Sequence, residues 1–159
     1  MRRGVTGASK PRPPKSLQAR AIGCLARREY ARAELRDKLL ATGATPIEVD
    51  PVIDDLAAQG YLSDERYAHA LVRQKSGGYS KRSIAQTLKA KGIPGEVVTE
   101  ALDGGDADDA ATLVALWRRR FGRAPADDRE RARQARFLQS RGFGLSAILK
   151  LLRDPPADA

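Results

Sequence analysis

The segment YSKRSIAQTLKAKG, residues 79–92, has the features of a short helix that ends at a glycine. Ile84 and Leu88 are four residues apart, so they share one face of a helix. Ser80 precedes this pattern and is a residue type that caps helix N-termini. Gly92 stands where the helix must stop, and glycine tolerates the left-handed conformation found there. The segment therefore predicts a helix followed by a turn.

The same pattern occurs three times along the chain, at glycines that are 49 and 50 residues apart. Each copy has a leucine four residues before its glycine, and the first two have an apolar residue eight before it. A repeat of this length is typical of proteins built from stacked supersecondary units. The glycines are Gly43, Gly92 and Gly142, the leucines Leu39, Leu88 and Leu138, and the residues eight before are Leu35, Ile84 and, as an exception, Gln134.

A second apolar pattern follows each glycine and predicts a short returning helix. Val98 and Ile148 stand six residues after the second and third glycines. Leu102 and Leu152 stand ten residues after them. In the first copy we assign these two places to Val52 and Leu56, which requires three extra residues in the turn. Because neither helix can bury its apolar face alone, we expect each pair to pack with the helix that precedes it.

The fold class that follows is all-α: three tandem three-helix repeats forming an elongated, curved molecule. No segment alternates between apolar and polar residues for long enough to predict a strand. We expect repeats at 17–63, 64–105 and 106–153, between a basic N-terminal arm, 1–16, and a C-terminal tail, 154–159. The expected helices cover about 17–28, 32–42, 48–59, 64–75, 81–91, 95–102, 107–121, 128–141 and 145–153.

The 159-residue chain carries a formal net charge of +9, which favours polyanions or acidic protein surfaces as partners. The N-terminal arm carries +5, and the three expected repeats carry −1, +2 and +5 in order. The positive field therefore grows toward the C-terminal repeat.

The glycine-rich stretch SGGYSKRSI, residues 76–84, raises the question of a phosphate-binding loop. Its glycines are adjacent and follow a helical pattern, whereas such a loop needs G-x-x-x-x-G-K-[ST] after a strand. A joint between two helices fits better, with Tyr79 and Ile84 placed as a hydrophobic staple around Ser80. Ser63 offers the same cap to another helix. The first copy has Ala31 at this place, so we expect its helix start to be the weaker one.

Residues able to perform catalysis are scarce. His69 is the only histidine, and we expect it to be a partly exposed helix residue. Cys24 is the only cysteine and lies in an apolar stripe, which favours a small core residue over a nucleophile. Trp117 is interpreted as a core anchor. We therefore expect no enzyme activity, no metal and no cofactor.

Basic residues near helix ends are the remaining functional signal. Arg129, Arg133 and Arg136 share one helix face, where like charges repel unless a negatively charged partner compensates. A solvated surface is the simpler interpretation for any single residue; DNA backbone and an acidic protein groove are the candidate partners. The candidate binding residues are Arg73, Lys75, Lys81, Arg82, Lys89, Lys91, Arg118, Arg119, Arg120, Arg129, Arg133, Arg136 and Arg141.

Three segments resemble the motifs of the RecX family. GYLSDERYAHALVRQKSGGYSKRSIAQTLKAKGI, residues 60–93, looks like the central signature. REYARAELRDKLLATG, 28–43, is similar to the opening motif Y-S-x-x-E-L-x-x-K-L-x-x-x-G, with Ala31 in place of serine. RARQARFLQSRGFGLSAILKLL, 131–152, is similar to the closing R-F-L-x-x-R-G-F segment. The resemblance covers roughly 17–153.

The resemblance implies a bacterial regulator of the RecA recombinase, acting in DNA repair and recombination. Such a protein binds the RecA–DNA filament along its groove. It inhibits strand exchange and ATPase activity, or disfavours growth and persistence of the filament, without catalysis of its own. We expect a cytoplasmic monomer that binds DNA weakly by itself and has no membrane association. The alternative is a general DNA-binding protein that uses its basic helix faces.

Overall fold

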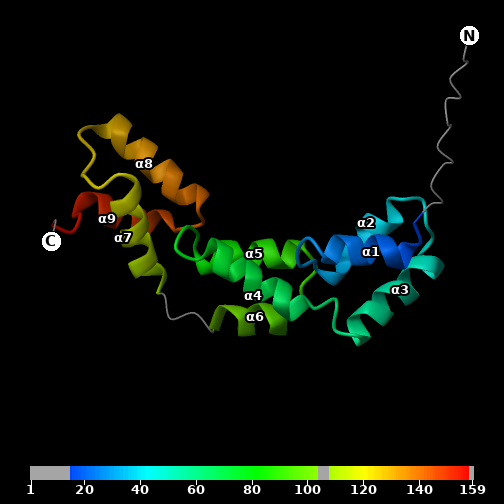
Figure 1. Ribbon diagram of the computed structural model, residues 1–159. Helices are drawn as coiled ribbons and strands as arrows, with labels where there is room; N and C mark the ends of the chain where they lie inside the picture. The colour runs from blue at the N-terminus through cyan, green and yellow to red at the C-terminus, as the bar shows by residue number, and fades with distance from the viewer. Residues whose placement is uncertain (1–14, 104–107, 158–159) are drawn as a thin grey trace, which may run out of the picture.

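The computed structural model describes residues 15–103 and 108–157, and within these ranges the chain forms nine helices and no strand (Figure 1). The helices lie where the periodicity predicts them, with ends that differ by at most three residues. Two predicted limits, residue 107 as a helix start and the boundary at 105–106, lie outside the described residues, as do 1–14 of the arm and 158–159 of the tail.

The nine helices form three groups of three, each with its own hydrophobic core. Repeat 1 contains α1 (Leu17–Leu25), α2 (Arg32–Leu40) and α3 (Pro46–Ala58). Repeat 2 contains α4 (Asp64–Lys75), α5 (Lys81–Ala90) and α6 (Gly95–Asp103). Repeat 3 contains α7 (Asp109–Arg120), α8 (Asp128–Ser140) and α9 (Leu145–Arg153).

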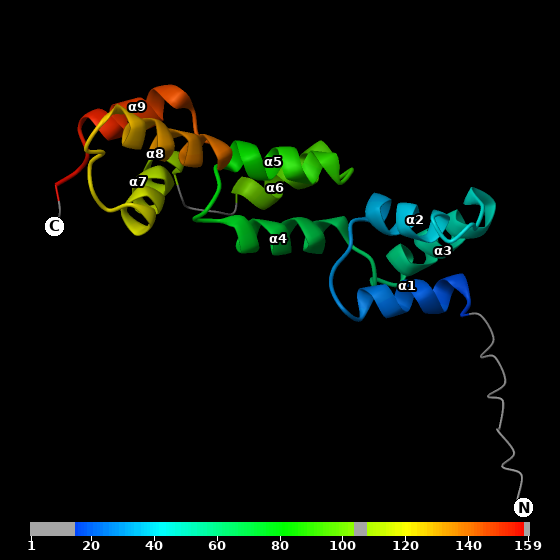
Figure 2. The same ribbon diagram turned by 90° about the horizontal axis from the view of Figure 1, so that it is seen from above.

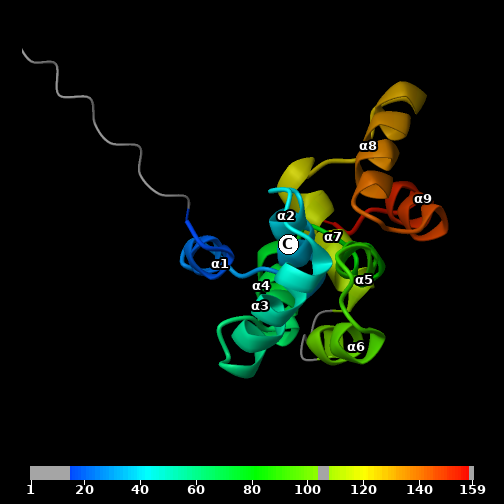
Figure 3. The same cartoon turned by 90° about the vertical axis from the view of Figure 1, so that its right-hand side faces the viewer.

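The repeats follow one another in a row, so the molecule is long in two views and narrow when seen from its end (Figures 1, 2 and 3). Repeat 3 is turned away from the line of the other two, which makes the row bent (Figure 1). The all-α, elongated and curved architecture expected from the sequence is thereby confirmed.

Each core is centred on the leucine that precedes the repeat glycine. Leu39, Leu88 and Leu138 are at most 1% exposed and belong to three separate clusters. Gly43, Gly92 and Gly142 have φ values of 93°, 77° and 92°, the left-handed conformation that ends a helix. The repeat register predicted from the glycines is therefore correct for the second helix of each repeat.

The register of the third helix in repeat 1 was wrong. The turn after Gly43 has no extra residues, because α3 begins three residues after the glycine, as α6 and α9 do. Val49 and Ile53, at most 2% exposed, therefore take the places assigned to Val52 and Leu56. The additional length of α3 lies at its C-terminal end.

The start of α3 carries a sequence signal from which the correct register of this helix could have been predicted. Pro46 is the first helical residue, and the backbone N–H of Thr45 donates to the Glu48 carboxylate at 3.3 Å. Proline at this position and a Thr-x-x-Glu spacing are both sequence marks of a helix start.

Gln134 replaces an apolar residue because it has a partner in the core of repeat 3. Its side-chain oxygen accepts a hydrogen bond of 3.0 Å from the Trp117 indole N–H, and both residues are buried. A leucine at 134 would leave the buried indole donor without this acceptor, at a cost of about 1–3 kcal/mol. The expected role of Trp117 as a core anchor is confirmed.

Adjacent repeats are joined by the same capping contact at both junctions. The first residue of the first helix in each following repeat accepts a hydrogen bond from the first backbone N–H of the second helix in the repeat before it. Asp64 accepts from Arg32 N at 2.8 Å, and Asp109 accepts from Lys81 N at 3.0 Å. Carboxylates at a helix N-terminus are favourable because they pair with free N–H groups and the helix dipole.

The two helix starts differ in their local caps, as the sequence predicts. Ser80 Oγ accepts from Ser83 N at 3.1 Å and donates to the carbonyl of Gly142 in the next repeat at 2.9 Å. Ala31 makes no such cap and instead packs, fully buried, in the core of repeat 2. Asp64 is thus the side chain that caps α2.

Replacing Ser80 with alanine should lower the free energy of unfolding by about 1–3 kcal/mol, since it removes a cap and an inter-repeat hydrogen bond. Urea denaturation measures the change. Ser63→Ala is the matched control, because Ser63 caps α4 by accepting from Arg66 N but makes no hydrogen bond to another repeat. Equal losses in the two variants would show that the bond to Gly142 contributes nothing.

Candidate functional site

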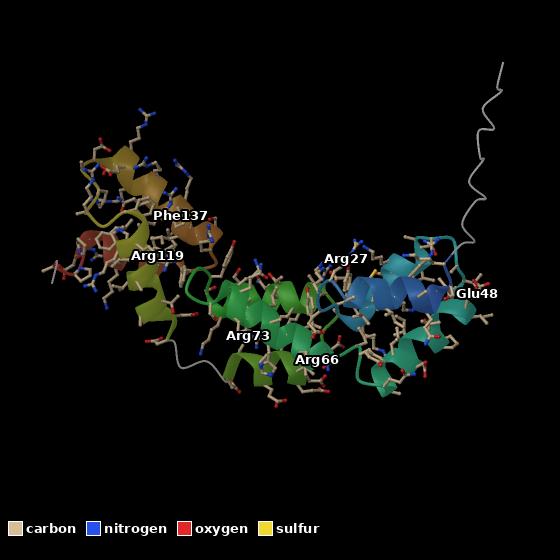
Figure 4. The ribbon with its side chains drawn as sticks, in the orientation of Figure 1. Arg27, Glu48, Arg66, Arg73, Arg119 and Phe137 are labelled. Carbon is tan, nitrogen blue, oxygen red and sulfur yellow. The ribbon has the colours of Figure 1, made fainter. Side chains whose placement is uncertain are left out.

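The thirteen basic residues predicted from the sequence lie on repeats 2 and 3, and ten of them are exposed. Lys75, Lys81 and Arg141 are half-buried. Arg73 is on α4, and Arg119 is on α7 in the neighbouring repeat (Figure 4). The structure brings some of these residues together where repeats 2 and 3 meet and leaves others apart.

Tyr79 holds two of these cations at the junction of repeats 2 and 3. Lys75 Nζ lies 4.3 Å from the ring centre, and Arg141 Cζ lies 4.6 Å from it. Tyr79 belongs to the turn between α4 and α5, whereas Arg141 follows α8, so the contact crosses the junction. Cations over aromatic faces are stabilised by the ring quadrupole, which orders otherwise mobile side chains.

Phe137 extends this arrangement along repeat 3. Arg141 and Arg120 place Cζ at 5.0 and 5.2 Å from its ring centre. Phe121 packs edge-on against Phe137, with centres 5.5 Å apart. We call the set Lys75, Tyr79, Arg119, Arg120, Phe137 and Arg141 the junction cluster.

Arg119 joins the cluster through the backbone of the preceding repeat. Its guanidinium donates to the carbonyl of Gly77 at 3.2 Å, which ties α7 to the turn after α4. In the part of the chain that the structure describes, no ion pair uses a cation of the junction cluster. The cluster therefore presents ordered positive charge without a neighbouring carboxylate, and such a surface suits a polyanion.

The arginine face of α8 lies beside the junction cluster and is partly compensated by its own helix. Arg133 lies 3.8 Å from Glu130, and Arg131 lies 3.7 Å from Asp128. Both pairs are long and the arginine of each is solvent-exposed, so each contributes little to stability. Arg129 and Arg136 are exposed and form no ion pair within the described residues.

Lys89 and Lys91 lie at the far end of α5, close to repeat 1 rather than to the junction cluster. Lys91 Nζ pairs with Glu34 Oε2 at 3.0 Å, and Arg28 pairs with the other oxygen at the same distance. Glu34 has a side chain only 15% exposed, so it is the half-buried centre of a bridge between repeats 1 and 2. Lys91, one of the thirteen predicted binding residues, therefore already has an acidic partner within the protein.

Burial opposes ionisation of Glu34, but the hydrogen bonds from Arg28 and Lys91 outweigh it and hold the pKa of Glu34 below its ordinary value. The same hydrogen bond with Glu34 raises the pKa of Lys91. A carboxyl group with a lowered pKa stabilises the fold above its unfolded pKa, and this contribution is lost as pH falls through the folded value.

We expect Glu34→Gln to lower stability by about 1 kcal/mol at neutral pH and by less at an acidic pH, because the contribution of the ionised carboxylate is lost as pH falls through its lowered pKa. Thermal unfolding at both pH values measures the difference. Glu100→Gln, on the exposed face of α6, removes the same charge and is the control. A loss that persists undiminished at acidic pH would contradict an ionic role for Glu34.

The sequence pattern predicts no role for Tyr79 and Phe137 in the basic surface. It places Tyr79 in a hydrophobic staple and indicates no contact for Phe137. The sequence signal for such a role is weak, because an aromatic residue beside a basic one does not reveal which distant cation will lie over its ring. His69 is an exposed residue of α4, as expected. Cys24 is half-buried and packs against the core of repeat 1.

In the described ranges no group of three or more His, Cys, Asp or Glu side chains is placed to hold a metal ion. None of the helices described there is long and apolar enough to cross a membrane.

The fold and its basic junction define a helical-repeat protein with an extended cationic surface. Three family models match it in order: the first three-helix domain of RecX at residues 19–56, the second at 63–102 and the third at 107–152. The chain belongs to the RecX family, and the resemblance found in its sequence motifs is confirmed.

Curated relatives and solved structures agree with this assignment. The chain is 44% identical to the regulatory protein RecX of Leptothrix cholodnii, over 89% of this chain and 90% of that protein. It is 39% identical to the regulatory protein RecX of Ralstonia pickettii, over 89% of each chain. The crystal structure of RecX from Lactobacillus salivarius matches with a TM-score of 0.65 at 21% identity, covering 86% and 94% of the two chains, and supports the fold.

Proposed function

We propose that this protein is a cytoplasmic, non-enzymatic regulator that binds the RecA–DNA filament and inhibits its ATPase and strand-exchange activities. The observation that carries the proposal is the ordered match of all three RecX domains along one chain. RecX relatives are named regulatory proteins, and regulation of RecA is the activity that the family resemblance implies.

The geometry supports a filament as the partner. A bent row of three repeats can follow a helical groove over a long distance, and solenoid-like molecules use such extended surfaces for binding. The junction cluster and the arginine face of α8 offer positive charge to acidic protein surfaces and to DNA phosphates within the same groove. We propose that the thirteen basic residues contribute to this contact as a set.

The rate of single-stranded-DNA-dependent ATP hydrolysis by RecA, with and without this protein, tests the proposal. We expect the rate to fall and the protein to sediment with the filament. An unchanged rate together with absence from the filament pellet would exclude the proposed function.

A general DNA-binding protein is the second candidate. The cations of the junction cluster that lie over aromatic rings favour it. It requires tight binding to naked DNA, with an affinity that falls steeply as salt rises. Fluorescence anisotropy with labelled single and double strands distinguishes the two. Binding in the micromolar range or weaker, lost at physiological salt, would leave the filament as the main partner.

We expect Arg129→Ala, Arg133→Ala and Arg136→Ala together to weaken filament binding about 10- to 100-fold, since each arginine supplies one exposed ionic contact. The salt dependence of binding should become shallower by roughly one unit of log–log slope per lost phosphate contact. Co-sedimentation over a salt series measures both.

The matched control changes three exposed basic residues of repeat 3 that lie outside the predicted set: Arg123, Lys150 and Arg153. Alanine at these positions removes the same charge from the same repeat. Equal weakening by the two triple variants would show that only net charge matters, and retained affinity in the α8 variant would make its arginines a merely solvated face.

A further inference from the structure

A cleft of about 380 Å³ lies on repeat 1, lined by residues of α1, α2 and the segments next to them. This volume falls within the range of roughly 300–1,000 Å³ that small-molecule sites occupy. Its polar lining consists largely of cations, with no carboxylate among the lining residues. The cations are Lys15, Arg20, Arg27 and Lys38.

These four charges have no acidic partner in the described part of the chain. The acids of repeat 1 are used elsewhere: Glu34 pairs with Arg28, while carboxylates on α3 pair with Arg32 and Arg36 on α2. Arg27 lies at the end of α1 that faces repeat 2, and Glu48 lies at the opposite end of the repeat (Figure 4). Three of these cations belong to the segment 17–63, whose net charge is −1, and Lys15 comes from the adjoining basic arm.

The floor of the cleft is apolar. Tyr30, only 6% exposed, and the buried Leu39 contribute to its wall together with the half-buried Cys24. Lys38 Nζ lies 5.7 Å from the centre of the Tyr30 ring, so one cation stands where the apolar wall and the basic rim meet. The Arg28 guanidinium covers one face of the Tyr30 ring, with Cζ 3.6 Å from the ring centre, so the ring contributes to the wall without stacking on a ligand there. A ligand with an anionic part and an apolar part would match both surfaces.

Gly23 lines this cleft from α1. It lies inside α1, where glycine costs about 1 kcal/mol of helix stability relative to alanine. A Cβ atom added at Gly23 would meet no atom within 4 Å, and its φ is not left-handed. Packing and backbone conformation therefore do not require a glycine, so a side chain can be introduced at this position to test the cleft.

We propose that this cleft binds one nucleotide unit, with its phosphate held by the four cations and its base and sugar against the apolar wall. The space is too small for a duplex but suits a free nucleotide or one nucleotide of a single strand. Phosphate recognition by convergent Lys and Arg side chains and contact of a base with apolar groups are the shared chemistry. The proposal concerns repeat 1 alone and is independent of the filament contact of repeats 2 and 3.

Isothermal titration of the full chain with ATP, adenosine and a short oligothymidylate tests the proposal and identifies the source of the nucleotide. Binding of ATP supports a free nucleotide, and binding of the oligothymidylate without ATP supports a strand. Adenosine lacks phosphate and should bind at least 10-fold more weakly than ATP. Adenosine binding as tightly as ATP, or no binding of either phosphate-bearing ligand, would overturn the proposal.

Gly23→Glu fills the cleft and adds a negative charge, so it should weaken binding at least 10-fold. The matched control is Gly95→Glu at the start of α6, where an added Cβ also meets open space and where the same charge enters repeat 2. This control should bind within about twofold of the unmodified protein. Circular dichroism verifies folding, and the double variant Arg27→Ala, Lys38→Ala provides a second test if Gly23→Glu unfolds. Binding that survives in folded variants would contradict the assignment.

Discussion

Leu88→Ala should lower the free energy of unfolding by about 2–5 kcal/mol, because it removes a fully buried side chain from the centre of repeat 2. Loss of the buried methyl groups and the cavity left behind both contribute. Leu39→Ala and Leu138→Ala should have effects of the same size, because each leucine occupies the same place in another core. Guanidinium denaturation followed by circular dichroism measures all three.

The separation of the cores adds a second expectation. Because the three leucines share no neighbours, their effects should add within about 0.5 kcal/mol in double variants that still unfold in one transition. Leu149→Ala, on the exposed side of α9, is the control and should change stability by less than about 1 kcal/mol. An unchanged stability in Leu88→Ala would contradict the repeat register and the core it defines.

Gly142→Ala should destabilise the protein by about 2–5 kcal/mol, for two reasons that add. The residue has a φ of 92°, which costs a non-glycine residue roughly 1–2 kcal/mol. An added Cβ would also stand 2.5 Å from Ser83 Cβ and against Ser80 Oγ, so it would force repeats 2 and 3 apart, at a further cost of about 1–3 kcal/mol.

Gly43→Ala is the matched control for this second effect. Gly43 has a φ of 93° at the equivalent turn, but an added Cβ there meets nothing within 4 Å. We expect it to cost only the backbone term, about 1–2 kcal/mol. Thermal denaturation of the two variants separates the contributions, and equal losses would show that the close approach at Gly142 is relieved without cost.

The elements of this fold could be predicted because their signals are local. Apolar residues four apart, serines before them and glycines after them specify each helix within a few residues of its own length. The exception is the helix after Gly43, which begins earlier in the sequence than expected, at a proline and a Thr-x-x-Glu start. The basic residues of the candidate site could also be identified from the sequence, since the charge of a side chain follows from its residue type.

The contacts between repeats could not be predicted, because they join residues about 30–60 positions apart whose types are individually ordinary. Asp64 and Asp109 appear in the sequence as acids of a helix first turn, yet each caps a helix of the preceding repeat. Ala31 appears as a missing cap, yet its small side chain lets repeat 1 enter the core of repeat 2.

The sequence by itself thus determined the helices, their threefold repetition and the rising positive charge, because periodicity and composition do not depend on long-range geometry. Only the tertiary structure decided which charges are neutralised and which stay available. It pairs Lys91 with Glu34, places Lys75 and Arg141 on opposite sides of the junction around Tyr79, and gathers four cations around one cleft, three of them from a segment whose net charge is negative. The physical reason is that electrostatic interactions fall with distance in space, and the distance between two side chains is set by how the repeats pack.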